Sequence, residues 1–435
     1  MSTSSPSARA AALSAGAGVA LVVAADVVWR WTYKDIDVEF PPLHATWDPR
    51  IGLLTLPAVA IGLTLWLVLP RLAQSLSWRA LLATAFATTW IWTMALAMTE
   101  GKDGLARVFE RRQEYVYDAQ HVTSISTMMH TFIDRIPFDS PHNWYVHVAG
   151  HPPGSLLFFV LLDRLGITGF FSIGVVVVTI GSTAIIAVLI TLRALGSAQL
   201  ARGAMPWIVL APSAVWMGVT GDAVFTAVAA WGLALLALAA TSSGLRRVVT
   251  GIGAGLLLGL CVYLSYGLVL LGFLAVAVLL IARSWRPLPW ALGGSAIVVA
   301  AFTAAGFSWW KAYPVLVQRY NDGIAHTRPY DYWVWADIAA WTFTAGIAVW
   351  AAFPAASRAF RQRNVVAQLA AAALLTIGFA AVSGMSKAET ERIFLPFTIW
   401  IVALPMLLPA RWQRPLLLSQ VVIGLGVEQL LLTRW

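Results

Sequence analysis

Thirteen long apolar runs divide the chain, and they constrain its fold more than any other feature. Each run is near the twenty or so residues that an α-helix needs to cross a bilayer. None alternates as a strand would, and backbone polar groups in lipid must be satisfied within the segment. We therefore predict an all-α, polytopic transmembrane helical bundle of about 13 spans. The runs lie at 10–30, 51–70, 79–98, 167–192, 203–219, 221–241, 248–264, 266–282, 288–309, 335–353, 364–383, 393–409 and 415–433.

Composition supports lipid as the main solvent. Of the 435 residues 59% are hydrophobic and 11% charged, whereas soluble domains carry about 25% charged residues. The net charge of +9 would suggest nucleic acid in a soluble protein, but the arginines lie in short loops between apolar runs, so no nucleic-acid partner is expected. The single cysteine, Cys261, excludes a disulfide framework and a cysteine metal site. The first run lacks a convincing small-residue cleavage site, which favours a retained span over a signal peptide.

Arginines and acids occupy opposite sets of loops. None of the arginine-rich loops carries an Asp or Glu, and the positive-inside rule places those loops in the cytoplasm. The N-terminus is then cytoplasmic, the C-terminus external, and the extracytoplasmic face of the plasma membrane holds the acids. The arginine set comprises Arg9, Arg71, Arg79, Arg193, Arg202, Arg246, Arg247, Arg283, Arg286, Arg358, Arg361, Arg363, Arg411 and Arg414.

The outer loops suggest a division of the chain. We predict three N-terminal spans (1–98), an outer loop (99–166), a core bundle (167–309), an outer aromatic loop (310–334) and a C-terminal bundle (335–435). The apolar stretch 154–165 is too short to span, and it is expected to lie in the outer interface as a helix.

The long outer loop contains two motifs that could carry chemistry. In the first, 114–121, Asp118 is expected at the N-cap of a helix over about 119–136, where it could be only a cap or could carry chemistry. In the second, 147–154, His151-Pro-Pro-Gly predicts a rigid helix entry that aims His151 back toward the loop, although it could equally be a satisfied interfacial histidine. Five of the seven histidines lie in this loop, but no close-spaced ligand pattern is clear. No metal site is predicted, and a divalent cation stays an open cofactor.

Two later markers lie on the same predicted face. Asp222 opens a span, where an acid is either functional or a helix cap. The run 386–392 places Lys387 and Arg392 against the positive-inside trend. Such cations suggest an anionic partner such as a phosphate; the alternative is a salt-bridged turn with Glu389 and Glu391.

This ordered set of motifs resembles the GT-C glycosyltransferases, which use polyprenyl-phosphate sugars, such as the protein O-mannosyltransferases and the mycobacterial mannosyl- and arabinosyltransferases. The likeness covers about 100–245, and 387–392 looks like the late charged loop of actinobacterial members. The family loop usually follows the first span, whereas here it follows the third. Residues 1–75 then look like an added hairpin, with Asp35 and Asp37 as rival acids. The family also often has adjacent acids, whereas Asp118 has Glu114 four residues before it.

The resemblance implies transfer of a sugar, mannose or arabinose, from a polyprenyl-phosphate donor to a glycan, lipid or protein acceptor of the cell envelope, with inversion by a carboxylate base. Tyr and Trp of 310–334 would line the sugar site or the lipid entry. The implied roles are general base for Asp118 with Glu114 in support; donor phosphate binding for His151, Lys387 and Arg392; and substrate binding for Asp222, Glu391, Tyr117 and His147.

Two other functions stay open at this point. A transporter or flippase of lipid-linked glycans would also need many spans and intramembrane charges. Few charges lie inside the runs, however, and no paired inverted halves are evident. The third alternative is a non-catalytic membrane protein of envelope assembly.

Overall fold

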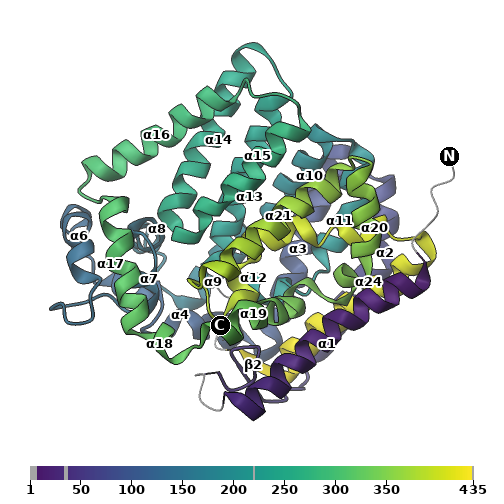
Figure 1. Cartoon of the computed structure of the whole chain (residues 1–435), viewed down its shortest axis with the longest axis horizontal. Helices are drawn as coiled ribbons and strands as arrows, with labels where there is room; N and C mark the ends of the chain where they lie inside the picture. The colour runs from purple at the N-terminus through teal and green to yellow at the C-terminus, as the bar shows by residue number, and fades with distance from the viewer. Residues whose placement is uncertain (1–6, 34–37, 219–220, 434–435) are drawn as a thin grey trace.

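The computed structural model describes residues 7–33, 38–218 and 221–433 and confirms the all-α prediction. Within that part of the chain the only strands are β1 (Ala45–Trp47) and β2 (Leu431–Thr433), which pair antiparallel with Ala45 opposite Thr433. Figure 1 shows α1 along one edge of the bundle and α16 along the opposite edge, with α13, α14 and α21 between them. The small helices α6, α7, α17 and α18 gather at the end remote from the N-terminus.

Seven helical segments in the described residues are long and apolar enough to cross a membrane, or nine if two bent pairs each count as one span. The seven are α1 (Ala8–Thr32), α2 (Thr55–Ser75), α3 (Trp78–Ala97) with η1 (Met98–Glu100), α9 (Phe170–Ser182) with α10 (Ala184–Leu195), α13 (Asp222–Ala240), α14 (Gly244–Leu264) and α21 (Val365–Ser383). The bent pairs are α16 (Leu288–Ala304) with α17 (Trp309–Asp322), at 73°, and α19 (Tyr330–Ala345) with α20 (Ile347–Arg361), at 101°.

The count of thirteen spans was therefore too high for the described residues, because several apolar runs are broken. Run 203–219 is split where Pro212 separates two helices, and 393–409 and 266–282 each contain a 3₁₀ turn. Run 415–433 belongs to a helix that is long enough but begins and ends among charged residues. The helices concerned are α11 (Ala198–Val209), α12 (Ala214–Met217), η3 (Tyr266–Leu270), α15 (Leu271–Ile281), α23 (Leu395–Ile401), η4 (Leu404–Leu407) and α24 (Ala410–Leu430).

Small residues bring the central helices close together, as expected where lipid gives no hydrophobic drive between helices. Gly251, Gly255 and Gly259 follow one face of α14, which packs against α16 and α13. A Cβ at Gly255 would lie 1.9 Å from the carbonyl oxygen of Ala291 on α16. No side chain fits there, so this stripe sets the α14–α16 distance.

The outer loop is helical over much of its length. The predicted helix at 154–165 is present as α8, packed on α5 and α14. The helix predicted over 119–136 was wrong. Val122 and Thr123 favour extended backbone, and Ser124 then caps a new helix by accepting the Thr127 N–H at 3.2 Å. The loop elements are α4 (Lys102–Glu110), α5 (Tyr115–Gln120), α6 (Ile125–Thr131), η2 (Ile133–Arg135), α7 (Val146–Gly150) and α8 (Pro153–Arg164).

The predicted added hairpin, residues 1–75, is integrated into the bundle. Helix α1 packs on α19 and α20, and the hydroxyl of Tyr332 donates to the carbonyl oxygen of Ala25 at 3.0 Å. Between α1 and α2, strand β1 joins the end of the chain through β2. The rival acids Asp35 and Asp37 lie outside the described residues.

Candidate functional site

A pocket of about 240 Å³ lies where the outer loop meets the last third of the chain. Its walls come from α7, α17, α18 (Ile324–Thr327) and the segment 385–393, which includes α22 (Thr390–Ile393). One part of the wall is apolar and the other is charged or polar. The apolar part includes Phe138, Val146, Leu316, Ile324, Met385 and Ile393; the polar part includes His147, His151, Arg319, Tyr320, Arg328, Lys387, Glu389 and Arg392.

A buried acid–histidine–arginine chain forms the floor of this pocket. The Oε1 atom of Glu114 is 2.7 Å from His147 Nδ1, and His147 Nε2 is 3.3 Å from Arg392 Nη2. Because the guanidinium can only donate, the neutral tautomer that fits carries its proton on Nδ1. His147 then donates to Glu114 and accepts from Arg392.

Arg392 links this chain to two more carboxylates. Its Nη1 donates to Asp222 Oδ2 at 2.7 Å, and its Nη2 donates to Glu389 Oε2 at 2.6 Å. Glu389 also lies 3.4 Å from Arg328 and 3.5 Å from His44. The salt-bridged turn considered for 386–392 is thus present as the Glu389–Arg392 pair. We call Glu114, His147, Asp222, Glu389 and Arg392 the site network.

The network keeps its acids ionised although they are buried. Burial alone would raise the pKa of Glu114, but its interaction with His147, followed by the charge of Arg392, holds it below its usual value. The pKa of Glu389 is likewise held well below its usual range, because Arg392, a hydrogen bond from His44, and Arg328 outweigh burial. For Arg392, burial opposes the charge, but the carboxylates of Asp222, Glu389 and Glu114 raise its pKa. Glu114, Glu389 and Arg392 are therefore ionised at neutral pH, next to the pocket.

Glu389 of the site network lies in a strained turn. Ala388 and Glu389 both have left-handed backbone, with φ of 66° and 63°, and each such non-glycine residue costs about 1 kcal/mol or more. Asp337 of α19 holds the turn, because its Oδ1 accepts the Ala388 N–H at 3.0 Å and its carbonyl oxygen accepts the Thr390 hydroxyl at 2.9 Å. Strain of this kind gathers at functional sites.

Two cations on the pocket wall are bonded to carbonyl oxygens. Arg319 Nη2 donates to the carbonyl oxygen of Trp144 at 2.9 Å, and its Nη1 donates to that of Ile136. Lys387 Nζ donates to the carbonyl oxygen of Ala325 at 3.1 Å. Among the described residues neither has an ion pair with a carboxylate, so both positive charges face the pocket without an acidic counter-ion.

Other predicted site residues lie away from the pocket wall. Asp118 is in the first turn of α5 rather than at a helix N-cap, and its Oδ2 accepts the Tyr145 N–H at 3.3 Å. Burial raises its pKa, although that N–H opposes the shift. Tyr117 packs on His121, with ring centroids 4.5 Å apart. Glu391 is buried within the bundle, and its carbonyl oxygen accepts the Thr344 hydroxyl at 2.7 Å.

His151 lies in the pocket wall, at the turn that leads into Pro152 and α8. Its Nδ1 is 2.8 Å from the carbonyl oxygen of His147, and its ring packs edge-on to Tyr115. Burial lowers its pKa to about 4, against the opposing charge of Asp222. In the neutral ring the proton lies on Nδ1, which donates to the carbonyl oxygen of His147, so Nε2 can accept a hydrogen bond from a ligand, and the ring brings no charge to a phosphate.

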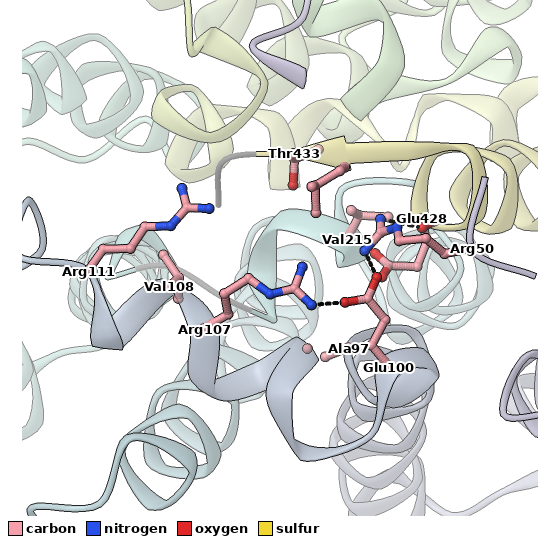
Figure 2. Close-up of a pocket in the computed structure, with 11 residues that line it drawn as sticks. Arg50, Ala97, Glu100, Arg107, Val108, Arg111, Val215, Glu428 and Thr433 are labelled. Carbon is pink, nitrogen blue, oxygen red and sulfur yellow. Dashed lines mark hydrogen bonds and ion pairs between the residues drawn. The ribbon is translucent and has the colours of Figure 1, made fainter. Parts of the chain in front are cut away.

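A second acid–arginine cluster lies beside α4 (Figure 2). Glu100 stands between Arg50 and Arg107 and pairs with both. Arg50 also donates to the carbonyl oxygens of Glu428 and Leu431. The cavity inside this cluster is about 30 Å³, room for about one water molecule. We call Arg50, Glu100 and Arg107 the arginine clamp, because they tie the α1–α2 segment, α4 and the C-terminal segment of α24 and β2 together.

No group of three or more His, Cys, Asp or Glu in the described part of the chain is placed to hold a metal ion. The divalent cation left open by the sequence stays a prediction.

Sequence reasoning missed several residues of the pocket. Arg319 and Arg328 line the pocket, and His44 lies behind it, beside Glu389; all three are far from the outer loop in sequence, and no local motif marked them. The one available signal was that Arg319 and Arg328, like Lys387, are cations on the predicted outer face, against the positive-inside trend. Glu389 had been considered only as a salt-bridge partner.

Comparison with known proteins gave only distant likenesses. No family model matches the chain, and no curated protein matches it. Two similar solved structures are ArnT from Cupriavidus metallidurans in the apo state, with 16% identity over 76% of this chain and a TM-score of 0.48, and the Archaeoglobus fulgidus oligosaccharyltransferase in complex with Zn and sulfate, with 13% identity over 80% and a TM-score of 0.42. The chain spans 59% and 53% of those two chains.

Proposed function

We propose that the protein is a membrane glycosyltransferase of the GT-C type that uses a polyprenyl-phosphate sugar donor. The observation that carries this proposal is one pocket that joins a buried, ionised acid–histidine–arginine network to an apolar wall and to two cations without acidic partners. A lipid-linked sugar phosphate has the same three parts: a sugar, an anionic phosphate and an apolar chain. Mannose or arabinose and an envelope acceptor follow only from the sequence resemblance.

The phosphate is proposed to bind beside Lys387 and Arg319. Within the described ranges neither cation forms an ion pair with a carboxylate, whereas Arg392 already donates to Asp222 and Glu389. A leaving phosphate gains most from donors fixed in a site that excludes water. Leu316, Ile324 and Ile393 would contact the first isoprene units. Arg392 then acts mainly by fixing the network, and the free Nε2 of neutral His151 accepts a hydrogen bond from a sugar hydroxyl of the donor.

The Glu114–His147 pair is proposed to remove the acceptor proton. His147 lines the pocket, and Glu114 orients its ring and stabilises the imidazolium that forms, the arrangement by which an acid supports a histidine base. The acceptor hydroxyl would replace the 3.3 Å contact between Arg392 and His147 Nε2. Its oxygen forms a bond to the anomeric carbon, the carbon–oxygen bond to phosphate breaks, and polyprenyl phosphate leaves with the electron pair. Asp118 stays a candidate base, set apart from this network.

Transfer from radiolabelled polyprenyl-phosphate mannose or arabinose to membrane acceptors, by purified protein in liposomes, tests the proposal. We expect Glu114→Gln to lower the transfer rate about 1000-fold, within the range for loss of general base catalysis, while donor binding persists. Asp118→Asn is the matched control, a second acid of the same helix region, and should keep at least about a tenth of the rate.

Three outcomes would count against the proposal in different ways. Relocation of labelled lipid without a new glycosidic bond would overturn the enzyme in favour of a transporter. A fully active Glu114→Gln would overturn the base. Loss in Asp118→Asn alone would return the role of base to Asp118.

A further inference from the structure

A second cavity, of about 310 Å³, opens at the other end of the molecule, among the arginine-rich loops. It lies between the C-terminal turns of α2, helix α11 and the N-terminal turns of α24. Its lining combines three arginines with glutamines and apolar side chains. The arginines are Arg71, Arg202 and Arg414, and the apolar side chains include Leu67, Trp207 and Leu417.

The charge in this cavity is one-sided. None of the described residues that line it is acidic, and the arginine-rich loops of this face contain no Asp or Glu. Three guanidinium groups around one cavity repel one another, and no acid of the lining offsets them. The cavity therefore favours an anion from outside the chain.

Two of the arginines are held in place by neutral partners. Arg202 Nη1 donates to the carbonyl oxygen of Ala73, at the end of α2, at 2.7 Å. Arg414 lies over the Trp66 ring, 5.0 Å from its centroid, and its own carbonyl oxygen accepts the Trp66 N–H at 2.9 Å. These contacts fix the side chains without neutralising them, and Arg71 stands exposed at the rim.

We propose that this cavity binds the headgroup of an anionic phospholipid. The phosphate would lie among Arg71, Arg202 and Arg414, and the acyl chains would run from the cavity over the apolar side chains of α2 and α24. Basic pockets between membrane helices on the cytoplasmic side suit such headgroups, because anionic lipids gather in that leaflet. This matches the leaflet predicted for the arginine-rich loops. The apolar wall commits the site to a lipid rather than to a free phosphate ion, and the proposal is independent of the sugar-transfer pocket.

Native mass spectrometry of the detergent-solubilised full chain, titrated with phosphatidylglycerol, measures this binding. We expect Arg71→Gln/Arg414→Gln to weaken the binding of the most tightly retained phosphatidylglycerol by about 30-fold, since each arginine near the membrane surface strengthens binding of an anionic lipid by about five- to sixfold. Arg202 is left intact because it also caps α2. The matched control is Arg246→Gln/Arg286→Gln, two arginines of the same face outside the cavity, which should retain the lipid as the wild type does.

Competition by two further ligands, phosphatidylcholine and inorganic phosphate, tests whether the bound anion is a lipid headgroup or a free ion. As a control for folding, each variant must first show an unchanged melting temperature in phosphatidylcholine. Phosphatidylcholine should not compete, and inorganic phosphate should compete only weakly. Full competition by inorganic phosphate would overturn the lipid assignment. Equal affinity of the wild type and Arg71→Gln/Arg414→Gln would overturn the site, as would an equal loss in the control pair.

Discussion

Two clusters built from residues of the predicted outer face pair carboxylates with arginines, yet they differ in what surrounds them. The arginine clamp closes on a cavity of about 30 Å³, whereas the site network borders one of about 240 Å³ with an apolar wall. The clamp's Glu100 is bridged by Arg50 and Arg107 (Figure 2). Beside the site network stand Lys387 and Arg319, which have carbonyl partners. Ion pairs alone therefore do not distinguish a candidate site. The site network differs from the clamp in its larger cavity, its apolar wall and its two cations that form no ion pair with a carboxylate.

The substitution Arg392→Lys should show most clearly that the site network, unlike the arginine clamp, acts on the transfer rate. Lysine keeps the positive charge, but its single ammonium group cannot donate to Asp222, Glu389 and His147 at the same time, as the planar guanidinium does. We expect the transfer rate per folded molecule to fall about 100- to 1000-fold, comparable to the loss of one fixed electrostatic donor, while the retained positive charge limits the fall in melting temperature. The measurement is the liposome transfer assay beside a thermal melt. An unimpaired rate would show that the network does not organise the reaction.

Glu100→Gln should do the reverse. It leaves Arg50 and Arg107 without their shared carboxylate, and breaking a largely buried pair costs about 3 kcal/mol. A clear fall in melting temperature is expected, with the transfer rate per folded molecule kept within about twofold of wild type. A strong loss of rate at full stability would instead make the clamp part of the site.

The pH dependence of stability should report His151. Its folded pKa of about 4 is below the ordinary value near 6.5, so the unfolded chain binds its proton first. The stability from this group is complete above pH 6.5 and is lost as pH falls from 6.5 toward 4. Between pH 7 and pH 5 the loss is about 2 kcal/mol.

The measurement for this prediction is the melting temperature of wild type and of His151→Asn at both pH values. The variant should show a smaller drop between pH 7 and pH 5. Parallel drops in the two proteins would mean that His151 does not titrate in this window.

The smallest effect is expected from Lys387→Met. Removing one cation that faces the donor phosphate should raise the KM for donor lipid about tenfold, a change of about 1.4 kcal/mol, with kcat less affected. Arg363→Met, on the arginine-rich face, serves as the control and should leave the KM unchanged. A fall in kcat with an unchanged KM would assign Lys387 to the transition state rather than to donor binding.

Part of the site could be predicted because its residues occur in local motifs. His147 and His151 lie before two prolines, and Asp222 opens an apolar run; all three are placed at or beside the pocket. Asp118 was favoured over Glu114 as base from the family resemblance, and it was expected at the N-cap of the loop helix. The helix begins earlier, however, so Glu114 faces His147 and Asp118 bonds to Tyr145 instead. A shift of one helical turn at the start of a helix is below what local sequence resolves.

The sequence by itself determined the all-α membrane architecture and the separation of arginines from acids. Both follow from rules that act along the chain: a bilayer needs about twenty apolar residues per span, and its leaflets sort positive charge. Only the tertiary structure decided which runs bend or break, and which charges meet. Asp222 and Arg392 are 170 residues apart in sequence, and no local pattern records a pair made across a folded bundle. Their contact depends on how α13 and α22 both pack against α23, and this packing brings charges from distant parts of the chain to one pocket.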